Sequence, residues 1–98
     1  MADLIVVYWR DIPAQVLVKA GRKTERRQLD KRFEVAIDAA AMRDGMTGTD
    51  AYLEQWRSAD PVAVDGDMGE AADAAVARLE AEFDKETLKA LVQNGGNA

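Results

Sequence analysis

The sequence has no cysteine and no histidine among its 98 residues. Without cysteine there is no disulfide framework, thiolate nucleophile, iron–sulfur cluster or cysteine zinc site. Without histidine the chain lacks the commonest general base and the commonest protein metal ligand. Ser58 is the single serine, so a serine–histidine hydrolytic site is excluded as well. We therefore predict no catalytic residue, no cofactor and no bound metal, and we do not expect an independent enzyme.

Long apolar runs are missing too, since none approaches the roughly 20 residues that cross a bilayer. The apolar stretch at residues 4–9 follows Asp3 rather than a basic segment, unlike a signal peptide. We therefore expect a soluble, cytoplasmic protein without membrane contact. The length predicts one domain over residues 1–98, with an ordered core at about 3–93 and a frayed Gly- and Asn-rich tail at 94–98.

Positive charge is scarce overall but concentrated. The net charge is −5, yet residues 1–49 hold nine Lys or Arg against seven Asp or Glu, while residues 50–98 hold four against eleven. We call the dense part of the first half the basic run, which comprises Lys19, Arg22, Lys23, Arg26, Arg27, Lys31 and Arg32. Such a run is either a solvated face or a surface that attracts an acidic partner. Nucleic acid is not expected, because no aromatic residue interrupts the run and the chain is acidic.

Three segments have the pattern of strands. Residues 4–9 are β-branched and aromatic, which is typical of a strand buried on both faces. Pro13 interrupts them, and residues 15–20 then alternate between two faces, which predicts a hairpin. Residues 62–64 form a short apolar strand between Pro61 and Asp65. Residues 22–28 are compatible with a loop or with a continuation of the second strand beyond a bulge at Gly21.

Helical spacing of apolar residues predicts four helices. Asp30, Thr49, Asp67 and Asp84 are the predicted N-caps, and Gly45 is expected to close the first helix in a left-handed conformation. The expected buried stripes are Phe33, Ala36, Ile37, Ala40 and Ala41 in the first helix, Tyr52, Leu53 and Trp56 in the second, Ala72, Ala75, Val76, Leu79 and Phe83 in the third, and Leu88, Leu91 and Val92 in the fourth.

The resulting order, β-β-α-α-β-α-α, predicts an α+β fold with a small three-stranded mixed sheet and helices on one face. Strand 1 is the most apolar, so we place it in the centre of a 2-1-3 sheet. Strand 2 would pair antiparallel to it at an edge, and strand 3 would lie parallel to it through a right-handed crossover. An edge position of strand 2 would let a partner add a strand beside the basic run.

Three stretches of sequence carry a family resemblance: YWRDIPAQV at residues 8–16, AIDxAAMR at 36–43 and GTDAY at 48–52. Through them the chain, over residues 4–83, resembles the bacterial "virulence factor" domain. That domain also occurs in the larger conserved virulence factor C, beside an iron–sulfur-scaffold-like module and helical repeats. The resemblance implies an accessory domain that works next to other modules, and an association with methyl transfer and folate one-carbon metabolism. It supplies no catalytic residues.

Two groups of residues are candidates for binding. Trp9, Arg10, Asp11 and Gln15 surround the first turn, where one of the aromatic pair Tyr8 and Trp9 is expected in the core and the other can stack on a ligand. The basic run adds Arg22, Arg26 and Arg27. Our leading interpretation is an accessory domain that docks on a larger protein through residues 8–15 and the basic run. The alternative is a site for a planar anionic ligand such as a folate or nucleotide.

Overall fold

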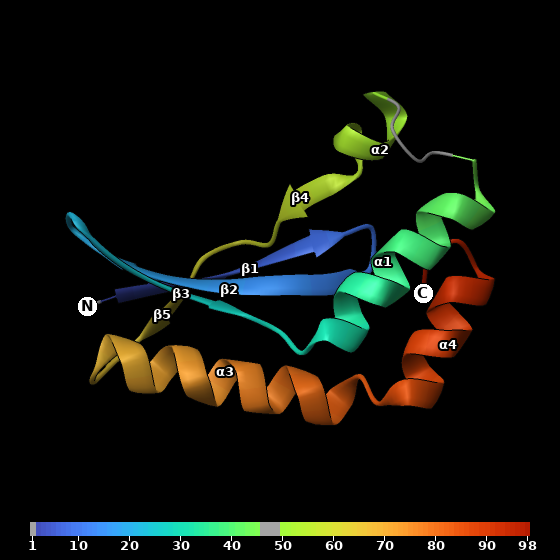
Figure 1. Ribbon diagram of the computed structural model, residues 1–98. Coiled ribbons are helices and arrows are strands. Elements are labelled where there is room, and N and C mark those ends of the chain that lie inside the picture. Colours follow the sequence, from blue (N-terminus) through green and yellow to red (C-terminus); the bar gives the residue numbers. More distant parts are fainter. Residues whose placement is uncertain (1, 46–49) are drawn as a thin grey trace.

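A computed structural model of the chain describes residues 2–45 and 50–98. A curved sheet has α3 along one face, α1 and α4 at one end, and α2 on the opposite side, which confirms the α+β class (Figure 1). The elements are β1 (Ala2–Trp9), β2 (Ile12–Ala20), β3 (Lys23–Gln28), α1 (Lys31–Arg43), α2 (Asp50–Glu54), β4 (Trp56–Ser58), β5 (Val62–Val64), α3 (Met68–Glu82) and α4 (Lys85–Gln93).

The sheet is antiparallel throughout. Its order is β3-β2-β1-β4, and β5 also pairs with β1. β1 therefore lies inside the sheet, as its apolar sequence predicts, with β2 on one side and the two short strands on the other. The segment that sequence patterns left open, residues 22–28, forms β3 and pairs with β2 from Ala20↔Lys23 to Gln15↔Gln28.

The predicted three-stranded sheet in the order 2-1-3 is wrong in three respects. The described part of the chain forms five strands, β2 is internal rather than at an edge, and β5 runs antiparallel to β1 rather than parallel. The internal position of β2 and the direction of β5 follow from β3, and the strand count also includes β4, whose Trp56 was predicted in a helix. Because β3 carries the chain back to the Trp9 end of the sheet, α1 and α2 begin and end there. The strand that follows them must then run opposite to β1.

The edge beside β1 is one interrupted strand. Trp56 of β4 lies opposite Trp9 of β1, and Val62 of β5 lies opposite Leu4 of β1. Between them Pro61 accompanies a shift of one residue in register, as expected of proline, which has no N–H to give to a strand ladder.

The second helix is shorter than predicted. It ends at Glu54, so Trp56 lies in β4 rather than on a helix, and Leu53 is 64% exposed rather than buried. The predicted cap, Thr49, lies outside the described residues. The spacing of Tyr52, Leu53 and Trp56 fits a helix, but a strand beside β1 accommodates Trp56 instead.

The other helix boundaries follow the predicted capping chemistry. Asp30, Asp67 and Asp84 each accept a hydrogen bond from a backbone amide two or three residues further on, at 2.8–3.3 Å. These bonds satisfy amides that the first helical turn leaves without a partner. Gly45 follows α1 with φ of +66°, a conformation that glycine adopts without a Cβ penalty.

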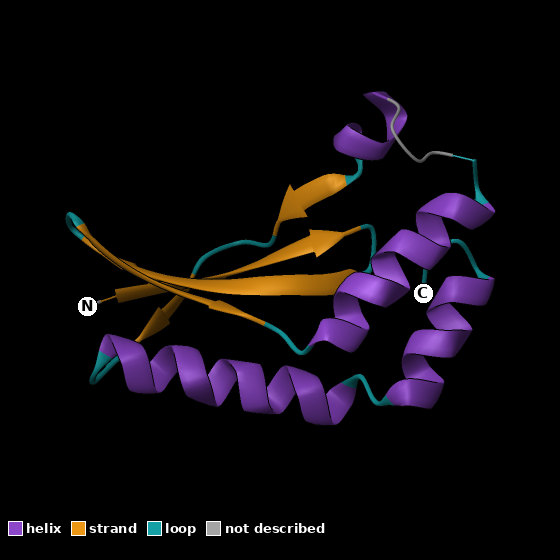
Figure 2. Cartoon of the chain, viewed as in Figure 1, coloured by secondary structure: helices purple, strands orange, loops and turns teal. Residues whose placement is uncertain are grey.

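The core lies between α1, α3, α4 and one face of the sheet (Figure 2). The rings of Phe33 and Phe83 meet edge to face with their centroids 6.3 Å apart, a favourable aromatic geometry. The predicted stripes of α1, α3 and α4 all pack in this core, although Val76, Phe83 and Val92 are only partly buried. The buried residues of β1 and β2 in this core include Ala2, Leu4, Val6, Val16 and Val18.

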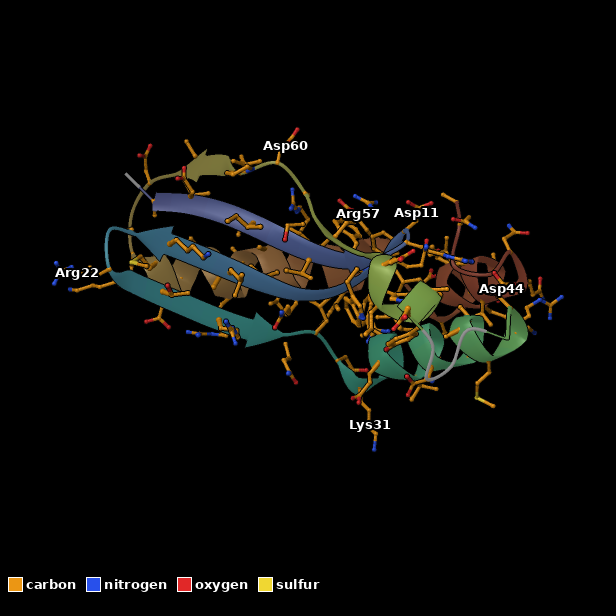
Figure 3. All side chains as sticks on the ribbon, turned by 90° about the horizontal axis from the view of Figure 1, so that it is seen from above. Asp11, Arg22, Lys31, Asp44, Arg57 and Asp60 are labelled. Carbon is orange, nitrogen blue, oxygen red and sulfur yellow. The ribbon has the colours of Figure 1, made fainter. Side chains whose placement is uncertain are left out.

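The opposite face of the sheet carries no helix along most of its length within the described residues, and Figure 3 views it from above. Strand alternation and register assign to this helix-free face Asp3, Ile5, Val7, Gln15, Leu17, Lys19, Thr24, Arg26 and Gln28. Leu17 is 9% exposed but does not belong to the core cluster, which confirms that it points away from the helices. Ile5 and Val7 are half-buried beside it.

The C-terminal segment differs from the frayed tail that its composition suggests. Gly95 and Gly96 are buried, and the amide of Gly96 donates to the Leu91 carbonyl at 2.7 Å. Gly96 has φ of +93°, and a Cβ there would lie 2.8 Å from the Trp9 ring. Glycine thus permits both the turn and the close approach that docks the tail.

Candidate functional site

Trp9, one of the two aromatic residues considered for stacking, is enclosed in the protein. Its side chain is 0% exposed, and its indole Nε1 donates to the Tyr52 carbonyl at 3.0 Å. The Trp9 and Tyr52 ring centroids are 5.7 Å apart. Trp9 therefore cannot stack on a ligand. It holds α2 against the end of β1 instead, and Tyr8 is the half-buried member of the aromatic pair, with the Arg57 guanidinium 4.7 Å from its ring centroid.

Arg10 fastens the same corner of the fold. Its φ is +53°, an unusual left-handed conformation for a residue with a side chain. Its backbone amide donates to the Gln55 carbonyl at 3.1 Å, and its Nε donates to Gln55 Oε1 at 3.2 Å. The guanidinium also pairs with Asp44 and donates to the Gly95 carbonyl at 2.6 Å. Arg10 thus joins the first turn to α1, to the α2–β4 corner and to the C-terminal segment.

Asp11 has a related role. Its carboxylate accepts from Arg57 Nη2 at 3.1 Å and from the Ala98 amide at 2.6 Å, while its own amide donates to Gly96 at 2.9 Å. Figure 3 shows Asp11 next to Arg57 at this end of the sheet. The Asp11 carboxylate, a candidate for binding a ligand or partner, thus binds β4 and the C-terminal segment of its own chain.

The basic run is divided between the two faces of the sheet. Arg22 extends from the tip of the β2–β3 hairpin (Figure 3), and Arg26 is exposed on the helix-free face. Arg27 points the other way, towards α3, and pairs with Asp73 at 2.9 Å and with Glu25 at 3.0 Å. Side-chain hydrogen bonds to Glu25 and Asp73 raise the pKa of Arg27 above its ordinary value. The run is therefore not one continuous positive patch.

Gln15 lies in a cavity of about 310 Å³ at the Trp9 end of the helix-free face. Ala14, Leu29 and Ile37 form its apolar part, and the Leu29 amide donates to the Ala14 carbonyl at 3.2 Å. The remaining lining residues are Gln15, Gln28, Glu34, Asp38, Tyr52 and Trp56. β2, β3, α1, α2 and β4 all contribute, so the cavity exists only in the folded chain.

The cavity combines aromatic and negatively charged walls. The Tyr52 and Trp56 rings meet at 84° with their centroids 6.2 Å apart, and Trp56 is 37% exposed. Burial raises the pKa of the Tyr52 hydroxyl above its ordinary value, and the charges of Asp38 and Glu34 raise it further, against the lowering effect of a hydrogen bond with Trp56. The charges of Glu34 and Asp38 therefore make the part of the cavity beside the Tyr52 and Trp56 rings electrostatically negative.

Most of the cavity's polar residues are absent from the candidates that sequence patterns supply. Gln28, Glu34 and Asp38 were not singled out, whereas Gln15 was. Glu34 and Asp38 are four residues apart on α1, so helical spacing already places them on one face. Helical spacing does not indicate how the opposite wall of the cavity is held. In the fold, Trp9 binds Tyr52 and Arg10 binds Gln55, and these contacts position the α2–β4 wall.

Comparison with models of protein families shows which family the chain belongs to. A family model described as "Virulence factor" matches residues 7–92. The chain belongs to the virulence factor family. The matched range includes every residue that lines the cavity and the turn that fastens its wall. Searches of the curated proteins and of the solved structures find no significant match to this virulence factor domain.

Two further observations concern the described residues as a whole. In the ranges 2–45 and 50–98, no group of three or more Asp or Glu side chains converges in a way that would hold a metal ion. Across the same ranges no helix combines the length and the apolar character needed to cross a membrane. The loop at residues 65–67 contributes Asp67 as the N-cap of α3.

Proposed function

We propose that this virulence factor domain is a non-catalytic accessory domain that docks on a larger protein through its helix-free face. The supporting observation is the uncovered sheet surface itself. Leu17 and the half-buried Ile5 and Val7 form an apolar centre there, with Lys19 and Arg26 exposed beside it. An apolar centre within a polar rim is the usual composition of a specific protein interface.

The first turn, which was predicted to take part in docking, does not belong to this docking surface. Trp9, Arg10 and Asp11 already bind other parts of the chain, so they support the fold rather than face a partner. A partner also cannot add a strand to β2 as predicted, because β3 already pairs with that side of β2. The new sheet edge carries Lys23 and Arg26, and cationic side chains are a common protection against strand addition.

Affinity purification of the tagged domain from its native cells tests the proposal. The variant Lys19→Glu/Arg26→Glu reverses two charges on the helix-free face, whereas Arg78→Glu/Lys85→Glu reverses two exposed charges on α3 and α4. We expect a stoichiometric partner whose recovery falls about tenfold with the first variant and is unchanged with the second. Equal recovery with both variants, or the absence of any stoichiometric partner, would contradict the proposal.

A ligand-binding role is the second candidate, and the cavity of about 310 Å³ is the observation that favours it. Small-molecule pockets start at roughly this size. Folates and nucleotides suit it poorly, because their negative charges would meet Glu34 and Asp38. We expect calorimetry with folates and nucleotides to detect no binding at millimolar concentration, and saturable binding would restore a role in one-carbon metabolism.

A further inference from the structure

The cavity next to the proposed docking surface has a composition that selects for positive charge. Glu34 and Asp38 stand on one face of α1, and Gln15 and Gln28 supply amide oxygens from the strands. Within the described ranges these four side chains make no hydrogen bond or ion pair with the protein. Two neighbouring carboxylates repel each other on a helix, so a bound cation would relieve that repulsion.

The aromatic wall adds a second reason. Trp56 is partly exposed at the cavity, and Tyr52 lies edge-on to it. Cations bind favourably over the faces of such rings, and a guanidinium does so with a planar surface that also stacks. A guanidinium further has five N–H donors in a fork that matches carboxylates. The N–H donors of a guanidinium therefore match the acidic side of the cavity, and its flat face matches the aromatic side.

From these observations we infer that the cavity binds the guanidinium group of an arginine side chain on the partner protein. The inference rests on the proposed docking function and names the partner residue. A side chain fits better than a free ligand because the cavity opens at the end of the helix-free face. The partner residues on either side of the arginine would then contact the apolar centre at Val7 and Leu17. The acidic net charge of the domain favours the same encounter.

Fluorescence titration with N-acetylarginine methylamide tests the inference, because this probe reproduces the side chain and both flanking peptide groups. Trp9 is enclosed, so the signal should come from Trp56 and disappear in Trp56→Phe. We expect saturation with Kd of about 1 mM, as befits a single side chain. N-acetylcitrulline methylamide is uncharged and nearly isosteric, and it should bind at least about tenfold more weakly because the charge-assisted hydrogen bonds are lost.

Charge-neutral variants locate the site. Glu34→Gln/Asp38→Asn should weaken the arginine probe about tenfold or more, whereas Glu82→Gln/Glu86→Gln, which removes two exposed carboxylates from α3 and α4, should not. Equal binding of the arginine and citrulline probes would overturn the inference without any variant. Tighter binding of free arginine than of the capped probe would also overturn it, since that result assigns a small-molecule site.

The two proposals fail in different ways. If the arginine probe does not bind, yet recovery of a cellular partner still depends on Lys19 and Arg26, the docking surface stands and the cavity assignment is wrong. If the probe binds at Glu34 and Asp38 but no partner depends on the helix-free face, the docking proposal is wrong and the cavity is a ligand site.

Discussion

The two faces of the sheet are made by the same strands but have different surroundings. Val16 and Val18 face the helices and are completely enclosed, whereas Leu17 between them lies outside the core cluster and points away from the helices. Arg27 pairs with α3 on the covered side, and Arg26 next to it is exposed on the helix-free side. Adjacent residues of one strand thus have different surroundings: one packs in the helical core, and the next lies on the helix-free face, where we propose that a partner docks.

The largest contrast should appear when apolar residues are shortened on each face. Phe33→Ala removes an enclosed ring of α1 that packs edge to face on Phe83, and we expect it to lower the free energy of unfolding by about 3–5 kcal/mol. Leu17→Ala should cost about 1–2 kcal/mol, since no helix of the described ranges covers it and water can fill the space. Urea denaturation measures both values, and equal losses would mean that the helix-free face is a second core.

A pair of glycines makes the same comparison between a packed and an open position. In Gly96→Ala the new Cβ would lie 2.8 Å from Trp9, whereas at Gly21 nothing lies within 4 Å. Both glycines have positive φ, so each substitution costs about 1 kcal/mol for backbone conformation alone. Overpacking should bring Gly96→Ala to about 2–4 kcal/mol. Equal thermal denaturation midpoints for the two variants would contradict the docking of the C-terminal segment.

A smaller effect concerns the acid stability of the helical layer. Hydrogen bonds from Thr87 hold the pKa of Asp84 below its ordinary value, so the ionised form stabilises the folded state. That contribution is present above the unfolded-state pKa and is lost as the pH falls through the lower folded-state pKa. Asp84→Asn keeps a capping oxygen and should make unfolding less dependent on pH in that interval. Glu82→Gln is the control, and identical pH profiles for the two variants would contradict this assignment.

Local chemistry in the sequence predicted much of the fold. The caps at Asp30, Asp67 and Asp84, the hairpin at Pro13 and the central position of β1 all depend on residues close in sequence, and they are confirmed. Sheet topology was predicted wrongly because β3 has a polar sequence from Lys23 to Gln28. An edge strand with one partner needs few apolar residues, so its alternation is hidden. One unrecognised strand was enough to reverse the expected direction of β5.

The candidate site was predicted only in part. Gln15 lines the cavity, but Trp9 and Arg10 act from behind its wall. A sequence string shows that a tryptophan and an arginine stand together, but it does not show which residues they contact. Those contacts depend on the α2–β4 corner, more than forty positions further along the chain.

Site-specific photo-crosslinking in the native cells tests the central claim most directly. Benzoylphenylalanine at Thr24 would stand exposed on the helix-free face, and at Ala77 it would stand exposed on α3. The account predicts one discrete crosslinked product from position 24 and none from position 77, because only the first lies on the docking surface. A product from position 77 alone, or equal products from both positions, would contradict the assignment of the helix-free face.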